Sequence, residues 1–539
     1  MVSSQRNKHK LSRRPIFKDD YMTTSLAFRA ILLFLGLILC MQLALVFFFD
    51  AFVPMQDGHD RKNSTAKKSR VKSVRLDDIP PPLPPFAPIP DVEKHIEQTL
   101  KGNPSMNGIM GIIEGFLLDL HDTFKEMKNK RAERDEIVVK YVELAKKHLI
   151  PFDKIYRGKN IFPVREDESI FISLAAFREH LLGKTLEQLF SMAQNPDKIY
   201  VGVVVQNCWG TDYTCKTGAQ VVGKDKFGRD QTKVSDAPPD ANGVDEFCSN
   251  STFQHYCTSG HVRALYVNET ESLGPAVARY HASKLWMGET FYLQVDSHLK
   301  FAQNWDQLYI DEVKLTKFYP KSILSAYPPG FDGYKTNVRP SPGARLCNCE
   351  FSQSDVEHSI IRINAGGVTP SSATKPTQIP FMAAGFFFAR SEFLRDVPFD
   401  PLLPWTFMGE EIVLSMRSWT SGWKMYAPRK NLIAHQYRPG RMGLPKFWGS
   451  VSRTFGRQGP GFNTQLGSKV IHRIKHLIGY PESSRELVKA QGDLGVLDEY
   501  KYYALGNEST REQYMEFANI DIANHECSPI GWCHKSSLE

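Results

Sequence analysis

The chain has 539 residues, of which 42% are hydrophobic and 23% charged, which suffices for a membrane or linker segment and one large or two smaller domains. The net charge of +8 is concentrated at the amino-terminal end, where residues 1–75 hold 14 Lys and Arg against 5 Asp and Glu. The remaining residues carry 53 against 54, so they are almost neutral. This balance gives no electrostatic support for nucleic-acid binding by the main domain, and we expect no nucleic-acid partner.

The amino-terminal segment predicts a membrane anchor. Residues 1–29 are polar and basic and suit a cytosolic tail, whereas residues 30–49 contain no charge and are long enough to cross a bilayer as a helix. This stretch is longer than the apolar core of an ordinary signal peptide, and no clear cleavage site follows it, which favours an uncleaved anchor. Basic residues flank it almost equally, so the positive-inside rule leaves its orientation open.

Two features favour a lumenal location for everything after the anchor. Four glycosylation sequons follow it, beginning at Asn63, Asn250, Asn268 and Asn507. Eight cysteines also follow it, none in a CxxC pair, and an even number suggests disulfides in the secretory pathway. Cys248–Cys257 and Cys527–Cys533 are the predicted local pairs; the alternative is eight free thiols in a cytosolic domain. We therefore expect a single-pass type II protein of the Golgi or endoplasmic reticulum membrane.

Residues 50–160 are predicted to form a stem. Residues 79–90, IPPPLPPFAPIP, favour an extended polyproline spacer. Apolar residues then recur at helical intervals over 109–149, which predicts one or two amphipathic helices. Such helices usually provide packing surfaces, although a stem helix could also pair with a second copy of the chain as a homodimer. The globular domain is expected to span 161–539.

An alternating strand and helix pattern begins at residue 169. Residues 169–177 and 198–207 suit buried strands, and the stretch around 185–193 suits a helix between them. Short apolar strands separated by helices predict an α/β fold with a mostly parallel sheet. Ligands of such sheets bind beyond the carboxyl ends of the strands. The residues predicted at those ends are Ala175, Arg178, Gln206, Asn207 and Asp296.

The most informative stretch is residues 274–301. Its first part suits a short helix, and residues 290–296 alternate as a strand does, ending in Asp296-Ser297-His298. Residues two apart at a strand end point the same way, so Asp296 and His298 form a candidate ligand pair. An oxygen and a nitrogen ligand suit Mn²⁺ or Zn²⁺ better than Ca²⁺. The alternative is a capping aspartate and an ordinary surface histidine.

Further candidate site residues follow. Glu410 and Glu411 stand at an apparent helix start within residues 403–423, where they could equally be dipole caps. Residues 431–437 suit a short strand that reaches His435, a third candidate ligand. Gly385 interrupts the apolar run 380–389, which marks either backbone near a ligand or a bulge in a core strand.

Three ordered blocks carry a resemblance to a known family. They are GPAVARYHASKLWMGETFYLQVDSHLKF, then PFMAAGFFFARSEFLRDVPFDPLLPWTFMGEEIVLSMRSWTSGWKMYAPRKNLIAHQY, and YYALGNESTREQYMEFANID. They resemble glycosyltransferase family 60, the polypeptide α-N-acetylglucosaminyltransferases, which include the enzyme that modifies Skp1. MGEEIVLSMRSW is also similar, more distantly, to the GGEN-containing helix of the polypeptide N-acetylgalactosaminyltransferases. Both resemblances imply a GT-A fold and retention of the donor's anomeric configuration.

The resemblance also implies roles for the candidate residues. Asp296, His298 and His435 would hold Mn²⁺, or another divalent cation, on the diphosphate of UDP-N-acetylglucosamine (UDP-GlcNAc). Glu410 would bind sugar hydroxyls, while Glu411 replaces the Asn of the distant family, which leaves its role open. The implied donor-binding residues are Ala175, Arg178, Arg279, Asp296 and Ser297, although Arg178 and Arg279 could equally be structural salt-bridge partners.

The implied reaction transfers N-acetylglucosamine to a hydroxyl of a protein or glycan acceptor. The polar insertion at 208–257 and residues 339–378 are the predicted acceptor loops. Alternatives are another UDP-sugar donor, a catalytically silent binding protein of the membrane, and a metal-dependent hydrolase.

Overall fold

A computed structural model describes residues 92–534 except 102–103, 212, 219, 227, 229, 332, 334–336, 355–358, 438–443 and 458–460. These residues belong to one compact unit that spans 85–539. The predicted tail, anchor and proline-rich spacer lie outside the described residues. Within the part of the chain that is described, no helix is both long and apolar enough to cross a membrane.

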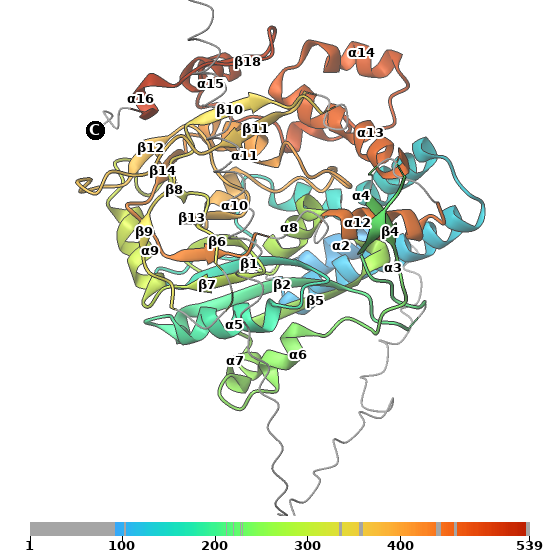
Figure 1. Cartoon of the computed structure of the whole chain (residues 1–539), viewed down its shortest axis with the longest axis horizontal. Coiled ribbons are helices and arrows are strands. Elements are labelled where there is room, and N and C mark those ends of the chain that lie inside the picture. Colours follow the sequence, from blue (N-terminus) through green and yellow to red (C-terminus); the bar gives the residue numbers. More distant parts are fainter. Residues whose placement is uncertain are drawn as a thin grey trace, which may run out of the picture. The chain divides into compact units, whose positions relative to one another are not determined.

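An eight-stranded sheet forms the centre of the fold (Figure 1). Its strands, in spatial order, are β12 (Thr377–Ile379), β14 (Lys424–Ala427), β8 (Ser322–Ser325), β13 (Phe386–Arg390), β6 (Phe291–Asp296), β1 (Ile170–Phe177), β2 (Ile199–Asn207) and β5 (Val262–Asn268). Only β13 and β12 run against the others. The prediction of an α/β fold with a mainly parallel sheet is therefore confirmed.

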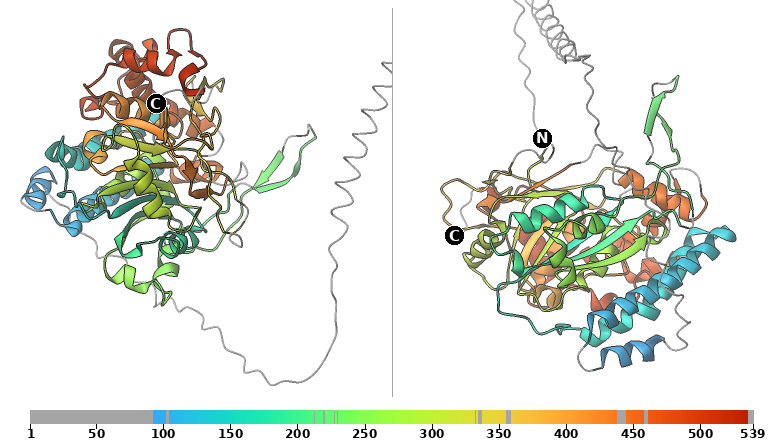
Figure 2. Two further views of the ribbon diagram at one scale, coloured as in Figure 1. Left: turned by 90° about the vertical axis from the view of Figure 1, so that its left-hand side faces the viewer. Right: turned by 90° about the horizontal axis from the view of Figure 1, so that it is seen from below.

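The strands are apolar on both faces because helices cover both sides of the sheet. Phe171 packs into the cluster shared with α3 (Met106–Asn129), α4 (Arg134–Tyr156) and α8 (Pro275–Ser283). Its neighbours Ile170 and Ile172 pack into the opposite cluster with α5 (Leu182–Ser191) and α9 (Trp305–Lys314). Figure 2 shows α3 and α4, in blue and cyan, across the sheet from α5.

Helices α3 and α4, predicted as stem, share the core of the globular unit. The Tyr141 hydroxyl donates a 2.5 Å hydrogen bond to the Pro401 carbonyl. Lys284, directly after α8, contacts Asp153 of α4 at 2.6 Å. The predicted stem boundary at residue 160 therefore does not coincide with a break in packing.

The insertion at 208–257 contains two short helices and a hairpin that extends away from the body of the unit (Figure 2). Disulfides join Cys208 to Cys215 and Cys248 to Cys257. The second of these was predicted from the sequence and is confirmed. The elements of this insertion are β3 (Gln220–Lys224), β4 (Asp230–Lys233), α6 (Gly243–Cys248) and α7 (Gln254–Thr258).

The predicted Cys527–Cys533 pair is wrong. Cys527 bonds to Cys349 and Cys533 to Cys347, because the carboxyl-terminal segment lies against β10 (Asn348–Phe351), which carries Cys349. Spacing along the chain could not show this contact between segments about 180 residues apart. Besides short 3-10 helices, the other described elements are α2 (Val92–Leu100), β7 (Leu299–Phe301), β9 (Ser341–Pro342), β11 (Ile361–Asn364), α10 (Phe393–Asp396), α11 (Glu410–Thr420), β15 (Lys430–Asn431), β16 (Ile433–His435), α12 (Leu444–Thr454), α13 (Gly461–Ile478), α14 (Arg485–Ala490), α15 (Arg511–Ala518), β17 (Ile520–Asp521), β18 (Glu526–Cys527) and α16 (Gly531–His534).

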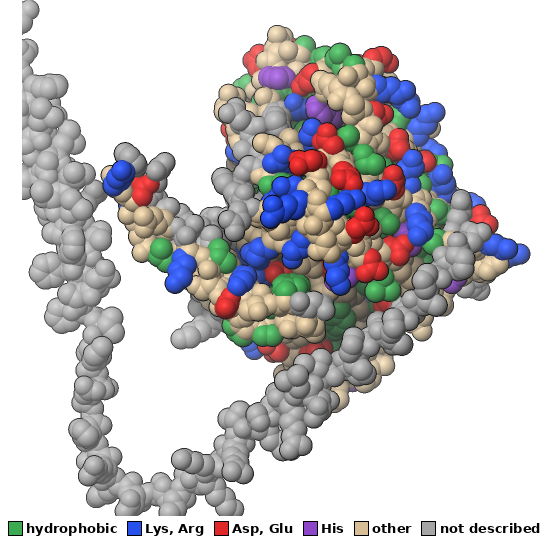
Figure 3. Space-filling model, turned by 90° about the vertical axis from the view of Figure 1, so that its right-hand side faces the viewer, with side chains coloured by type: hydrophobic (Ala, Val, Ile, Leu, Met, Phe, Trp, Pro, Cys, Tyr) green, Lys and Arg blue, Asp and Glu red, His purple; other side chains and the backbone are tan. Residues whose placement is uncertain are grey.

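Acidic and basic side chains intersperse on the face that Figure 3 shows, without a continuous patch of one sign. This mixture matches the near-neutral balance of the sequence after residue 75.

Candidate donor and metal site

The site lies at the carboxyl end of β6, in the middle of the sheet. Asp296 ends β6 and is paired in register with Ala175 of β1. The Ser297 hydroxyl donates a 3.3 Å hydrogen bond to the Ala175 carbonyl, which ties the residue after the strand to its neighbour. This tie holds the turn that places Asp296 and His298 at the sheet edge.

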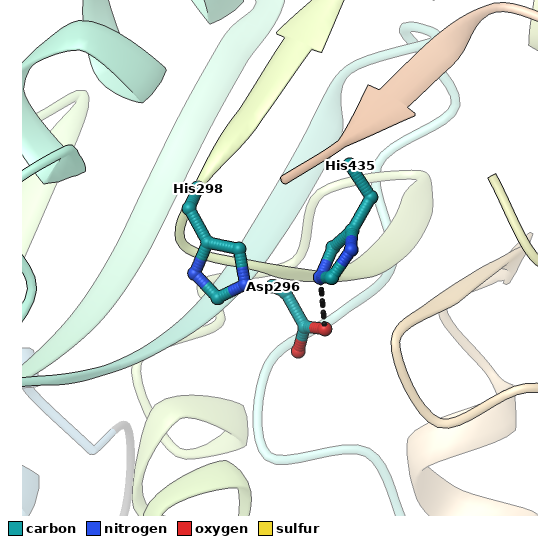
Figure 4. Close-up of side chains that lie close together, drawn as sticks. All are labelled: Asp296, His298 and His435. Atoms are coloured by element: carbon teal, nitrogen blue, oxygen red, sulfur yellow. Dashed lines mark hydrogen bonds and ion pairs between the residues drawn. The ribbon is translucent and has the colours of Figure 1, made fainter. Parts of the chain in front are cut away.

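His435 reaches the same edge because β16 pairs with β7, which directly follows the turn. The Gln436 amide also donates to the His298 carbonyl at 3.1 Å. Figure 4 shows Asp296 between the two imidazoles, with His435 Nε2 3.1 Å from Asp296 Oδ2. One ligand atom from each of the three residues lies within 4.8 Å of the others. The structure therefore brings together the three residues that the sequence singled out.

His298 has a second partner that sequence reasoning missed. Its Nδ1 lies 2.8 Å from Glu179 Oε2, on a carboxylate that is almost fully buried. Because a carboxylate only accepts, Nδ1 carries the proton, and Nε2 is left with its lone pair. A carboxylate behind a histidine is the usual outer partner of a metal-ligating imidazole.

Arg279 connects Asp296 with Glu410. Its guanidinium donates to Asp296 Oδ1 at 3.0 Å and to Glu410 Oε2. Burial raises the pKa of Asp296, but the hydrogen bond from His435 and the charge of Arg279 outweigh it, so the pKa lies well below the usual range. Asp296 is therefore ionised and able to bind a cation. The guanidinium of Arg279 is directed at these two carboxylates. Of the two roles that the sequence left open for Arg279, this contact is the structural ion pair.

Glu410 begins α11, after Gly409 in a left-handed conformation with φ of 95°. Its Oε1 is buried and has no hydrogen-bond partner among the residues that the structure describes. Burial raises the pKa of Glu410, and the Arg279 charge opposes this effect. An unsatisfied buried oxygen is costly, so a bound hydroxyl or amide that donated to it would stabilise the site.

Glu411 has a different environment from Glu410. Its Oε1 accepts the Ala384 amide at 3.0 Å, and its Oε2 lies 2.7 Å from the Tyr327 hydroxyl. Burial raises the pKa of Glu411 to about 7 although both hydrogen bonds lower it. These contacts attach the start of α11 to the segment before β13.

A cavity of about 220 Å³ opens beside these carboxylates. Asp296, His435 and Glu410 line it, together with the exposed rings of Phe407 and Tyr437. Gly385 lines it too, and a Cβ there would lie 2.9 Å from Asp296 Oδ2. The glycine thus allows the backbone to pass close to the Asp296 carboxylate, at the edge of the cavity.

Arg178 is engaged elsewhere. It makes two hydrogen bonds to Asp240 and a 3.0 Å ion pair with Glu269, and only 4% of its surface is exposed. The Asp240 carboxylate also accepts the Cys208 amide at 2.8 Å. Arg178 therefore anchors the 208–257 insertion to the end of β1, which is the structural alternative that the sequence left open.

Sequence reasoning missed Glu179, Tyr327 and Tyr437. Glu179 directly follows Arg178 at a predicted strand end, so its position could have indicated it. Tyr327 belongs to no quoted motif, and Tyr437 ends the block NLIAHQY without a role assigned to it; folding brings both to the cavity.

Comparison with known proteins agrees with this geometry. A family model described as Glycosyltransferase (GlcNAc) matches residues 169–524, about two thirds of the chain and all of the candidate site. The chain therefore belongs to this family and is a glycosyltransferase. No curated protein sequence matches it significantly.

Solved structures show only distant similarity. GalNAc-T7, crystallised with UDP, GalNAc and Mn²⁺, shares 15% identity over 68% of this chain with a TM-score of 0.34. The match spans 56% of the GalNAc-T7 chain. S. aureus TarS 1–349 in complex with UDP-GlcNAc shares 14% identity over 68% of this chain and 91% of its own, with a TM-score of 0.29.

Proposed function

We propose that the protein is a retaining glycosyltransferase that moves N-acetylglucosamine from UDP-GlcNAc to a hydroxyl of a protein or glycan acceptor. The observation that carries this proposal is the cavity that an ionised Asp296, His435 and the unpaired Glu410 Oε1 line, with His298 close to Asp296 beside it. A nucleotide sugar has both chemistries that such a cavity would recognise, a diphosphate that carries a metal ion and a ring with hydroxyls. The description of the matching family supports N-acetylglucosamine as the sugar.

The residues present fit a divalent cation. Asp296 supplies an oxygen, the Glu179 contact leaves His298 Nε2 with its lone pair, and His435 directs Nε2 at Asp296 from a distance of 3.1 Å. This oxygen and nitrogen set suits Mn²⁺, the cation that the family resemblance implies. A bound cation would act as a Lewis acid that stabilises negative charge on the departing UDP.

The protein's own groups would then position the sugar. Glu410 accepts from a sugar hydroxyl or amide through Oε1, while Arg279 holds Oε2 and the Asp296 carboxylate in fixed relation. Ala175 and Ser297, at the neighbouring strand end, would contact the donor through the turn that they stabilise. The exposed rings of Phe407 and Tyr437 provide apolar surface at the mouth for the acceptor.

Retention follows from front-face attack, which the family resemblance implies. The bond between the anomeric carbon and the phosphate oxygen breaks, and the acceptor oxygen bonds to that carbon from the same face. The acceptor proton passes to the departing phosphate oxygen. Glu410 binds the sugar and forms no bond to it.

The proposal also covers the particular glycosyltransferase family and the cellular location of the protein. The three motif blocks support glycosyltransferase family 60 with a GT-A fold. The uncharged stretch 30–49 and the four sequons support a type II protein of the Golgi or endoplasmic reticulum membrane with a lumenal catalytic domain. The cysteine bridges suit this oxidising compartment.

The decisive experiment measures UDP release by the full-length protein over a panel of UDP-sugars, with Mn²⁺ and then with chelator. We expect UDP to be released from UDP-GlcNAc and from no other donor of the panel. The release should be lost when chelator is added and in the Asp296→Asn variant. Release from a different UDP-sugar would correct the donor, and hydrolysis of substrates that lack a nucleotide would favour the hydrolase. UDP binding without release, even with acceptors present, would favour the silent binding protein.

Glu410→Gln separates sugar recognition from UDP binding. Because Glu410 contacts the sugar in this proposal, we expect turnover to fall by at least about tenfold with UDP affinity unchanged. Equal loss of both would mean that Glu410 only supports the fold.

A further inference from the structure

A second and larger cavity, of about 460 Å³, lies away from the proposed donor site. Its lining includes Lys321, directly before β8, and Ser421, shortly before β14, so it lies at the amino edge of the parallel strands. Asp296 and the donor site lie at the opposite edge. Helix α11 connects the two, with Glu410 at one end and Arg417 lining this basal cavity.

The lining of the basal cavity has excess positive charge. It includes seven Lys or Arg residues and three carboxylates. Each carboxylate is paired within the lining, in the contacts Lys284–Asp153, Arg395–Asp396 and Lys321–Glu508. Four cations are left without a carboxylate partner among the described residues, namely Arg157, Lys159, Arg417 and Lys501.

Arg417 is the most informative of these four. Only 3% of its surface is exposed, and its Nε donates a 3.4 Å hydrogen bond to the Ala504 carbonyl. Burial lowers the pKa of Arg417 to about 10, so the group is still charged at neutral pH. Burial of this guanidinium is unfavourable, and the Asp400 carboxylate, whose charge offsets part of the cost, is itself paired with Arg473 at 2.7 Å.

Arg157 is held in place at the rim. Its Nη2 donates to the Lys501 carbonyl at 3.0 Å, and its guanidinium lies 4.4 Å from the centre of the Tyr502 ring. Lys159 and Lys501 are exposed at the same rim. The four cations therefore come from the end of α4, from α11 and from the segment before α15, and they converge on one space.

We propose that the basal cavity is a binding site for a compact anion that carries two or more phosphate groups. Arg417 binds one phosphate at the bottom of the cavity, where the planar guanidinium suits bidentate contact with phosphate oxygens. Arg157, Lys159 and Lys501 bind the others at the rim. The site is independent of the metal and of the donor residues, since none of its residues lines the donor cavity.

The test is calorimetric titration of the full-length protein with inorganic tripolyphosphate in the presence of a chelator. The chelator removes any divalent cation, so that the donor site does not bind the probe through a metal. We expect one binding site per chain and unchanged affinity in Asp296→Asn. Titration with inorganic phosphate should give much weaker binding, because one phosphate contacts fewer of the four cations.

Two sets of variants locate the binding. Lys159→Gln with Lys501→Gln removes two exposed rim charges and should weaken tripolyphosphate binding about tenfold or more. The matched control, Lys125→Gln with Lys489→Gln, removes two exposed lysines that do not line the cavity and should bind like the unaltered protein. Arg417→Met should abolish binding while the protein remains folded, as measured by circular dichroism.

Several outcomes would overturn the proposal. These are no heat of binding at millimolar tripolyphosphate, loss of binding in Asp296→Asn, or equal weakening by the rim and control variants. Binding of a doubly phosphorylated peptide but not of tripolyphosphate would contradict the assignment to a small anion. Because no metal or donor is present, failure here leaves the UDP-release experiment unaffected.

Discussion

His298 Nδ1 lies 2.8 Å from Glu179 Oε2, so a buried carboxylate fixes which nitrogen of the imidazole faces Asp296. Glu179→Ala should therefore weaken Mn²⁺ binding by about 10–100-fold, because the histidine loses its orientation and some of its basicity. Glu179→Gln can still accept a hydrogen bond from Nδ1, so its Mn²⁺ affinity should lie between those of the unaltered protein and Glu179→Ala. Mn²⁺ titration followed by electron paramagnetic resonance measures this without any need for turnover.

The control for that prediction is Glu187→Gln on α5, whose carboxylate pairs with exposed Lys184 away from the site. It should bind Mn²⁺ like the unaltered protein. Unchanged affinity in Glu179→Ala would show that Glu179 does not position a metal ligand.

Gly385→Ala should damage the site while it leaves the fold intact. The added Cβ would stand 2.9 Å from Asp296 Oδ2, so the carboxylate must move. We expect at least a tenfold loss of kcat with a change in unfolding free energy below about 2 kcal/mol. Gly111→Ala in α3, where a Cβ meets no atom within 4 Å, is the matched control and should be neutral or stabilising. Full activity in Gly385→Ala would contradict the proposed position of Asp296.

Glu411 should make stability depend on pH. Its pKa is raised to about 7 in the folded protein, so between about pH 4.5 and 7 the unfolded chain has released a proton that the folded chain retains. The folded state therefore loses stability as pH rises through this window, by at most about 3 kcal/mol. In Glu411→Gln this contribution is absent.

Denaturant unfolding of both proteins at several pH values measures the difference. The unfolding free energy of Glu411→Gln relative to the unaltered protein should increase from pH 4.5 to 7 and then level off. Parallel pH profiles would mean that Glu411 titrates normally.

Arg178→Met tests whether Arg178 supports the fold or binds the donor. The change leaves Asp240 without its cation and Glu269 with only the 3.4 Å contact to Arg453, which should cost about 3–5 kcal/mol of stability. The folded fraction should keep its UDP affinity, measured by calorimetry at low temperature. A protein of unchanged stability that no longer binds UDP would show that Arg178 contacts the donor, as the family resemblance implies.

Much of the fold was predictable because its signals are local. Buried parallel strands need continuous apolar runs such as those of β1 and β2, and helices need apolar residues at helical spacing. The motif Asp296-Ser297-His298 at a predicted strand end indicated a metal site, and Glu410 at a predicted helix start indicated a second functional group. The positions of these residues were predicted from their neighbours in sequence and from the rule that strand ends share an edge. Their metal and sugar roles are what the family resemblance implies.

Only the tertiary structure decided which partners the charged and polar groups have. Arg279 is on a predicted helix and Arg178 follows a predicted strand, and both were candidate donor ligands. Yet Arg279 bridges Asp296 and Glu410, while Arg178 holds Asp240 of the insertion and Glu269. Cys527 likewise bonds to Cys349 and not to its neighbour in sequence. Hydrogen bonds and disulfides act over a few ångströms, so their pairing depends on which segments folding brings into contact. Sequence alone determined the chemistry available at the sheet edge, and the packing of distant segments determined which groups meet there.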